Sequence, residues 1–173
     1  MTEYEFELRF NLPTAADAAT AVESLGQAGC NDALVGIGQA GRIALRFARE
    51  AGSAIEAMAS ALQSVMGAIP AATLIEAGPD LVGLTDVAEL LGMTRQNMRK
   101  LMLADPAGFP PPLHEGSAAI WHLEPVLQWL RRKGYEIEQR QIDIARVAMQ
   151  VNLLKERTRI GLPAQPQLQA LLA

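Results

Sequence analysis

The chain has 173 residues, of which 50% are hydrophobic and 20% are charged. This composition excludes a wholly disordered chain, and the length excludes a large catalytic barrel and allows one ordinary domain or two small ones. The formal net charge is −4, but residues 1–82 carry 4 basic and 10 acidic side chains, whereas residues 83–134 carry 6 basic and 5 acidic ones. Because phosphate contacts need clustered Lys and Arg, any polyanion-binding surface is expected after residue 83.

The sequence does not suggest a membrane segment or a secretory leader. Residues 52–75 are interrupted by Glu56 and broken by Pro70, and the start, Met-Thr-Glu-Tyr-Glu, is acidic where a signal peptide is basic and then apolar. Cys30 is the only cysteine, so no internal disulfide can form. We predict a cytoplasmic protein with no membrane contact.

Residues 1–78 have the pattern of a small acidic α+β domain. Residues 3–10 alternate apolar and charged side chains, as a half-buried strand does. The following pattern predicts a helix that opens after residues 11–14 and closes at Gly26 and Gly29, a hairpin at 33–38 and 42–48, a helix at 53–67 and a short strand at 72–76. The order strand, helix, strand, strand, helix, strand predicts a ferredoxin-like (βαββαβ) domain with both helices on one face of an antiparallel sheet.

The charges on the first strand have two interpretations. If the first and third strands are neighbours, Glu5 and Glu7 lie near Arg42 and Arg46, and opposite charges across a strand pair are mildly stabilising. Acid and base catalysis would need two carboxylates in different environments, which alternating surface glutamates do not supply. We therefore predict ion pairs and no catalytic residue here.

Residues 36–41, Gly-Ile-Gly-Gln-Ala-Gly, match the letters of a dinucleotide-binding motif. In that motif the last glycine leads into a helix whose N-terminus faces the pyrophosphate. Here the alternating segment 42–47 follows instead. The glycines are better explained by a hairpin that requires positive φ, so no cofactor is predicted.

Residues 84–102 carry the most informative pattern in the chain. Thr85 is predicted to begin a first helix with an apolar face, Gly92 permits a tight turn, and Thr94 is predicted to cap a second helix. Met98 and Leu101 face inward on the second helix. This arrangement predicts a helix-turn-helix.

The second helix leaves polar side chains for solvent, namely Arg95, Gln96, Asn97, Arg99 and Lys100. Arg can bind guanine edges through two hydrogen bonds, Gln or Asn can do so with adenine, and Lys can meet phosphate. The alternative is an ordinary helical hairpin, because exposed helices commonly carry long polar side chains. The small residue at Ala88, the turn at Gly92 and the buried positions agree with the bacterial helix-turn-helix consensus, which favours DNA binding.

The next segment contains Phe-Pro-Pro-Pro at 109–112, an expected hairpin that turns at Gly116-Ser117, and a helix at 124–133 with a basic end. Residues 82–134 thus resemble the winged helix-turn-helix of phage excisionases, AlpA-type regulators and MerR-type activators. The resemblance implies a wing that touches DNA, and His114 and Ser117 occupy it here. Arg131 and Arg132 are either a solvated helix end or a phosphate clamp.

The histidines and tryptophans are the other residue types that could carry chemistry. His114 and His122 are eight residues apart without a Cys or carboxylate group nearby in sequence, which makes a poor metal site. Trp121 and Trp129 are expected to fix the wing to the core rather than to stack on bases. No metal is predicted.

Residues 135–160 predict a long helix with apolar stripes on two sides, which must pack back on its own chain or pair with a second subunit. We prefer a homodimer, since MerR-type activators dimerise through a helix after the DNA-binding part. Residues 161–173 are expected to form a flexible tail.

These patterns predict a sequence-specific DNA-binding transcriptional regulator that places a recognition helix in the major groove of double-stranded DNA. The acidic domain of residues 1–78 is predicted to bind a protein partner or a small ligand instead of DNA. The alternative is an antitoxin that binds a toxin protein and represses its own operon. An enzyme is not predicted, because the sequence offers no nucleophile with a base and no metal-ligand set.

Overall fold

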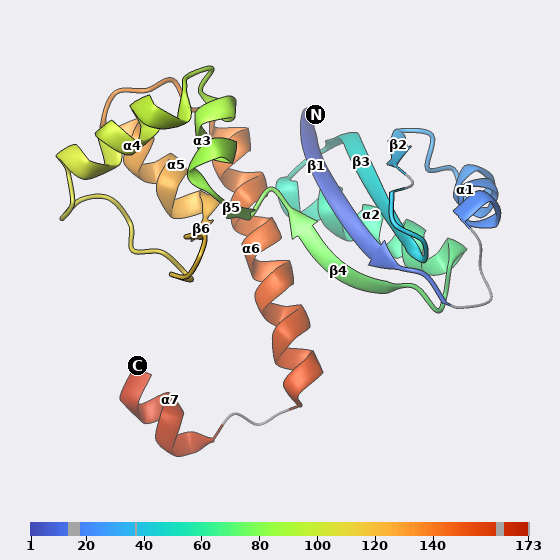
Figure 1. Cartoon of the computed structure of the whole chain (residues 1–173). Helices are drawn as coiled ribbons and strands as arrows, with labels where there is room; N and C mark the ends of the chain where they lie inside the picture. Colours follow the sequence, from blue (N-terminus) through green and yellow to red (C-terminus); the bar gives the residue numbers. More distant parts are fainter. Residues whose placement is uncertain (14–17, 37, 162–164, 173) are drawn as a thin grey trace.

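The computed structural model describes residues 1–13, 18–36, 38–161 and 165–172. Over these ranges the chain is a mixed α+β protein with a four-stranded antiparallel sheet, a second sheet of two short strands and seven helices (Figure 1). The elements are β1 (Thr2–Asn11), α1 (Ala18–Gln27), β2 (Ala33–Gly36), β3 (Arg42–Ala51), α2 (Ala54–Ala68), β4 (Thr73–Gly78), β5 (Leu81–Val82), α3 (Leu84–Leu90), α4 (Arg95–Ala104), β6 (Trp121–His122), α5 (Leu123–Arg132), α6 (Gln139–Ile160) and α7 (Pro166–Leu172).

The four-stranded sheet has the order β2-β3-β1-β4, so the first and third strands are neighbours, as the sequence predicted. β1 pairs with β3 along its whole length, but β4 pairs with β1 only from Glu7 to Asn11. The alternation in β1 turns its even-numbered apolar side chains into the core and its charged ones to the open face.

The expected ion pairs on the open face are only partly present. Glu7 lies opposite Arg46, with 3.7 Å between Glu7 Oε2 and Arg46 Nη2. Glu5 lies opposite Ala48, and Arg42 lies opposite Asn11 at the far end of the strand pair. The prediction that Glu5 neighbours Arg42 was therefore wrong, because the register separates them along the strand.

The hairpin expected around the glycine-rich segment 36–41 is present. β2 and β3 are antiparallel, with Ala33 opposite Phe47 and Gly36 opposite Ala44. Gly41 has a φ of +75°, a conformation that favours glycine. The segment that follows is a strand, as predicted, and residue 37 lies outside the described residues.

Helices α1 and α2 contribute to the core on the buried face of the sheet. In α2 the buried positions include the small residues Ala54, Ala57 and Ala61, which lets the helix lie close to the strands. Ile55 and Met66 point outward and are 59% and 54% exposed. Met58 and Val65 are buried as well, so the inward face of α2 combines small alanines with two larger apolar side chains.

Residues 81–137 form a second hydrophobic core from β5, β6 and helices α3 to α5. Helix α3 begins at Leu84 and its N-cap is Gly83, two residues before the predicted N-cap Thr85. The Asp86 carboxylate accepts the Gly83 N–H at 2.6 Å. The prediction of Thr85 as the N-cap was therefore wrong, because the bond between Asp86 and the Gly83 N–H starts the helix two residues earlier.

Helix α6 connects the two cores (Figure 1). Ile144 and Ala148 belong to the first core, whereas Ile142 and Ala145 belong to the second. Both apolar stripes of this helix are thus buried within the same chain over this stretch. Of the two arrangements that the sequence left open, the structure shows the helix packed back on its own chain, which removes the argument for dimerisation along these turns.

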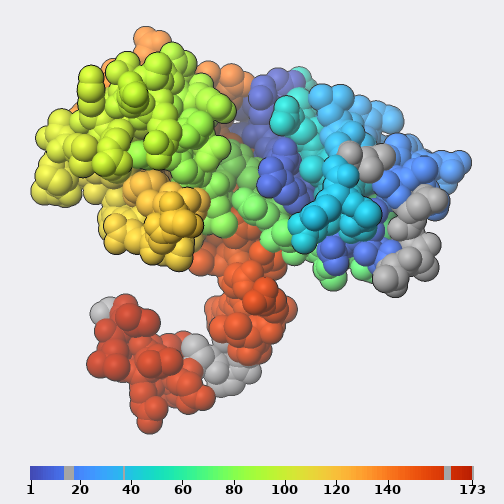
Figure 2. Space-filling model, in the orientation of Figure 1, coloured from blue at the N-terminus to red at the C-terminus, as the bar shows by residue number. Residues whose placement is uncertain are grey.

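The ends of α6 also differ from expectation. The helix begins at Gln139 rather than at 135, because Gly134 (φ +91°) ends α5 and Glu138 caps α6, its N–H donating to Gln141 Oε1 at 2.9 Å. Part of the predicted tail is helical as α7, which stands clear of the main body (Figure 2). No helix within the described ranges is long and apolar enough to cross a membrane.

Candidate nucleic-acid interface

The turn between α3 and α4 has the geometry that the sequence predicted. Gly92 adopts a φ of +63°, in the left-handed region that glycine favours. Its N–H donates to the Glu89 carbonyl at 3.1 Å, and the N–H of Met93 donates to the Ala88 carbonyl at 2.9 Å. These bonds close the end of α3 and set the direction in which α4 leaves.

Helix α4 begins with a side-chain cap. The Thr94 hydroxyl accepts the N–H of Asn97 at 3.2 Å, so its oxygen is already used within the chain. Met98 is fully buried, and Leu101 and Met102 are half-buried. The inward face of the helix is therefore the predicted one.

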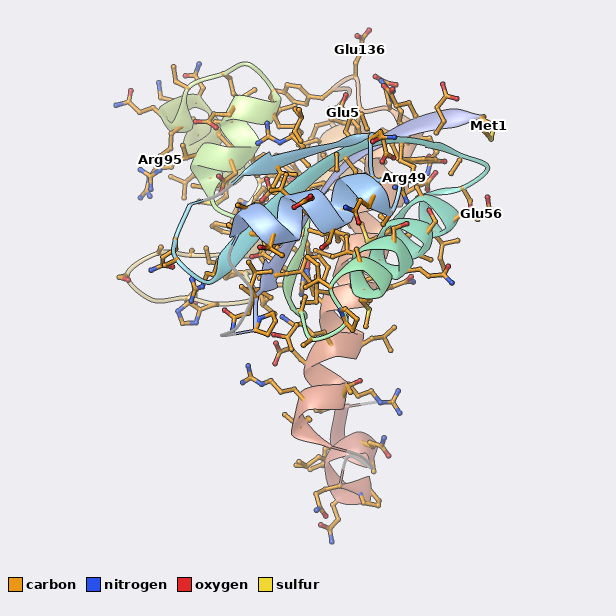
Figure 3. The ribbon with its side chains drawn as sticks, turned by 90° about the vertical axis from the view of Figure 1, so that its right-hand side faces the viewer. Met1, Glu5, Arg49, Glu56, Arg95 and Glu136 are labelled. Atoms are coloured by element: carbon orange, nitrogen blue, oxygen red, sulfur yellow. The ribbon has the colours of Figure 1, made fainter. Side chains whose placement is uncertain are left out.

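The opposite face of α4 is mainly polar, although it also exposes Leu103. The predicted set is exposed throughout, namely Arg95, Gln96, Asn97, Arg99 and Lys100. None of the three cations makes an ion pair or side-chain hydrogen bond with a residue that the structure describes. In Figure 3 Arg95 lies at the margin of the molecule and points away from the ribbon. The face therefore carries three positive charges without a direct ion-pair partner in the described part of the chain, although Asp86 and Glu115 line the groove that Arg95 and Arg99 border.

Arg95 and Arg99 border a groove of about 700 Å³ between α4 and the loop that follows it. The opposite wall contains residues 110–112 and 117–121, together with Glu115. The structure thus brings Ser117 to the same groove as the two arginines. Gln96, Asn97 and Lys100 lie outside its lining, as does His114.

The expected wing is smaller than a regular hairpin. A single bridge joins His114 to Ile120, supported by the Leu113 N–H, which donates to the Ile120 carbonyl at 2.7 Å. The His114 ring lies over Gly116, where an added Cβ would come within 2.6 Å of His114 Nε2. Gly116 therefore leaves room for the imidazole at the exposed tip of this loop.

Both tryptophans hold this loop to the second core. Trp121 and Trp129 are buried and make edge-to-face contacts with Phe109, with ring centroids 5.8 and 5.0 Å apart. Trp121 Nε1 donates to the Pro110 carbonyl at 3.1 Å, and Trp129 Nε1 donates to Asp105 Oδ2 at 2.9 Å. Their burial and satisfied N–H groups fit the predicted structural role.

The basic run at the end of α5 is mostly used inside the chain. Arg131 donates to Gln139 Oε1 at 2.6 Å and to Gln128 Oε1 at 3.3 Å. Lys133 Nζ lies 2.6 Å from Asp105 Oδ2, and this ammonium lowers the pKa of Asp105. Arg132 alone in this run is exposed without a partner among the described residues. None of the three lines the groove beside α4.

Sequence reasoning missed a buried polar network at the junction of the two cores. Asp80 is 1% exposed; its Oδ1 lies 2.7 Å from His122 Nδ1, and its Oδ2 accepts Asn152 Nδ2 at 2.8 Å. The signal in the sequence was an asparagine within an apolar stripe of α6. Asp80 thus bonds with His122 of the second core and with Asn152 of α6, so this network joins the two cores.

The chain matches no protein-family model, and no curated protein or solved structure is significantly similar to it. Within the described ranges, no group of three or more His, Cys, Asp or Glu side chains is placed to hold a metal ion. Functional conclusions therefore depend on the geometry of the site alone.

Proposed function

We propose that this protein is a sequence-specific DNA-binding regulator of transcription, in which α4 enters the major groove of double-stranded DNA. In this proposal Arg95, Gln96, Asn97 and Arg99 read base edges and Lys100 contacts phosphate. Residues 82–134 act as a winged helix-turn-helix, with His114 and Ser117 in a short wing and Arg132 as a further phosphate contact. Arg131 would first have to release its two glutamines.

The observation that carries this proposal is the clustering of three cations on α4 that are unpaired within the described chain. Most other cations of the described second half have a partner, Arg132 and Arg157 excepted. Lys133 is paired with Asp105, Arg140 with Glu138 and Arg146 with Glu124. The three cations of α4 have no such partner within the described chain, although they share one exposed face. Three unneutralised cations on one helix face favour a polyanion as their partner.

The rest of the molecule fits the same proposal. The strand order β2-β3-β1-β4 is that of a ferredoxin-like domain, which we propose for residues 1–78 as a unit that binds a partner rather than DNA. We propose that two copies associate to bind paired half-sites. Leu153, Leu154 and Ile160 at the end of α6 are exposed and supply the contact, since the earlier turns are buried in the chain.

The proposal is tested by titrating full-length protein with DNA from upstream of its own gene and with scrambled DNA at several salt concentrations. The variant Arg95→Ala/Arg99→Ala is expected to lose the preference for the upstream DNA and about 100-fold or more in affinity, because two base contacts of roughly 1–3 kcal/mol each are removed. A control variant, Arg42→Ala/Arg157→Ala, has the same net charge as Arg95→Ala/Arg99→Ala but leaves α4 intact.

The control variant is expected to keep both affinity and preference. If the wild type binds neither that DNA nor a library of genomic fragments at physiological salt, the DNA-binding proposal fails. It also fails if the two double variants lose affinity equally, since the binding would then reflect net charge alone.

A further inference from the structure

The N-terminal half of β1 has a free edge inside the molecule. β4 pairs with β1 only from Glu7 onward, and after Gly78 the chain leaves the sheet through Pro79 toward β5. Thr2 to Phe6 therefore have β3 on one side and, within the described ranges, no strand on the other. Strand edges of this kind present unpaired peptide groups that another strand can use.

This free edge faces a cleft between the sheet and the second core. The cleft has a volume of about 470 Å³, within the rough 300–1,000 Å³ range of ligand pockets. Five consecutive residues of β1, from Glu3 to Glu7, line it. One face of a strand would contribute only every second residue, so the consecutive lining shows that the edge itself borders the cleft.

The direction of the peptide groups follows from one hydrogen bond. Arg140 Nη1, at the start of α6, donates to the Glu3 carbonyl at 3.4 Å from the cleft side. Because peptide groups alternate in direction along an antiparallel strand, the N–H and C=O of Glu5 point to the same side. Tyr4 and Phe6 correspondingly direct theirs to β3.

The walls of the cleft differ in chemistry on its two sides. On the open face of the sheet the Glu3 and Glu5 side chains flank the free edge, and Arg140 reaches it from α6. Farther along the same face the lining contains Glu7, Arg9, Arg46 and Glu76, where Glu7 is paired with the two arginines. The pKa of Glu76 is raised, mainly because the side chain is buried. The Asp80 and Glu7 carboxylates raise it further, and Arg9 offsets part of the effect. On the covered side the lining is apolar and includes Leu123, Leu127 and Ile144.

We propose that this cleft binds an extended segment of a partner protein, which adds as a strand to residues Thr2–Phe6 of β1 and takes the place of Arg140 at the Glu3 carbonyl. Alternation along the added strand places one set of side chains beside Glu3 and Glu5 and the other set over the apolar wall. The fitting segment therefore alternates basic and apolar residues. This inference goes beyond DNA binding and does not depend on α4.

The test uses full-length protein labelled with ¹⁵N and the blocked peptide Lys-Val-Lys-Val-Lys-Val, with Glu-Val-Glu-Val-Glu-Val as the control. The basic peptide is expected to bind and to slow hydrogen exchange of the Glu5 amide, which gains a carbonyl partner. The acidic peptide, with the same alternation and length, is expected not to bind, because its carboxylates would meet Glu3 and Glu5.

Two variants separate the backbone contact from the charge. Glu5→Pro removes the N–H that faces the cleft and leaves the Tyr4 and Phe6 bonds to β3 in place, so it is expected to weaken peptide binding about tenfold more than Glu5→Ala does. Thermal unfolding of both variants checks that each one folds. If Glu5→Pro does not fold, the exchange rate of the Glu5 amide in the wild type still decides the question.

Several outcomes overturn this inference. These are no binding of the basic peptide up to about 1 mM, equal binding of both peptides, or binding without a change at the Glu5 amide. Concentration-dependent protection of that amide without any peptide would assign the cleft to a second copy of the chain instead. Loss of DNA binding in Arg95→Ala/Arg99→Ala with peptide binding retained would show that the two sites are separate.

Discussion

Asn152 of α6 pairs with the backbone of Ala77 as a neighbouring strand would. Asn152 Oδ1 accepts the Ala77 N–H and Nδ2 donates to the Ala77 carbonyl, each at 2.8 Å. Lys155, one turn later, donates to the Ile75 carbonyl. The outer edge of β4 is thus closed by side chains of a helix, whereas the free edge of β1 beside Glu5 stays open.

Asn152→Ala is expected to lower the free energy of unfolding by roughly 2–4 kcal/mol, because it removes the partners of two buried peptide groups and one of the partners of Asp80. Gln150→Ala, on an exposed position of the same helix, is the control and is expected to change stability by less than about 0.5 kcal/mol. Urea unfolding measures both. Equal stability of the two variants would contradict a structural role for Asn152.

A second prediction concerns Asp32, which precedes β2. Arg49 Nε donates to Asp32 Oδ2 at 2.6 Å and Arg49 Nη2 donates to Asp32 Oδ1 at 2.9 Å. These two bonds to Arg49 lower the pKa of Asp32 below its ordinary value of 3.8. Asp32→Asn is expected to destabilise the protein by about 1–2 kcal/mol at pH 7, since charge-assisted bonds are replaced by neutral ones.

The pH dependence of this effect has a defined sign. Because the pKa of Asp32 is lower in the folded state, its contribution is complete above about pH 4 and is lost as the pH falls through the folded-state value. The stability difference between wild type and Asp32→Asn should therefore shrink below pH 4. A difference that stays constant from pH 7 to pH 2 would contradict the ion pair as its cause.

Local patterns in the sequence predicted most elements correctly. The strict alternation around Phe6 specified β1 and its buried face, and Gly92 with Thr94 specified the turn into α4. These signals depend on a few neighbouring residues whose conformational preferences are strong. The pairing of Glu7 with Arg46 followed from strand order, but the offset of Arg42 from Glu5 depends on register, which no local pattern specifies.

Contacts between residues far apart in the chain could not be predicted from the sequence. The two stripes of α6 showed that both must be buried, but whether Ile142 and Ile144 meet a second subunit or two cores of the same chain is decided by tertiary packing. The Asp80 network was marked in the sequence only by Asn152 within an apolar stripe, and its partners could not be predicted because they come from three separate segments of the chain. The sequence also does not show which cations of the second half are already paired, as Lys133 is with Asp105.

A third prediction compares two glycines, one whose backbone conformation favours glycine and one whose position accepts alanine. Gly92 has a φ of +63°, so Gly92→Ala is expected to destabilise the protein by about 1 kcal/mol and to disturb the approach of α4 to DNA. Gly67 lies in α2, with nothing within 4 Å of an added Cβ. Gly67→Ala is expected to stabilise the protein by about 0.5 kcal/mol.

Thermal unfolding and the DNA titration together check this pair. The opposite signs make the comparison independent of any general effect of adding a methyl group. If Gly92→Ala were as stable as the wild type, the left-handed conformation of the turn would not matter for folding, and the close fit of α3 against α4 would need another explanation.

The last prediction separates phosphate contacts from base contacts on α4. Lys100→Ala is expected to weaken binding to specific and scrambled DNA alike and to reduce the slope of log affinity against log salt by about 1, because one fewer counterion is released. Arg157→Ala, which removes one exposed charge near the end of α6, is the matched control and should leave the slope unchanged. Fluorescence anisotropy at four or more salt concentrations would measure both slopes. If Lys100→Ala keeps the wild-type slope but loses sequence preference, Lys100 contacts a base and not a phosphate. If both variants have equal slopes and the preference is retained, Lys100 is not part of the interface.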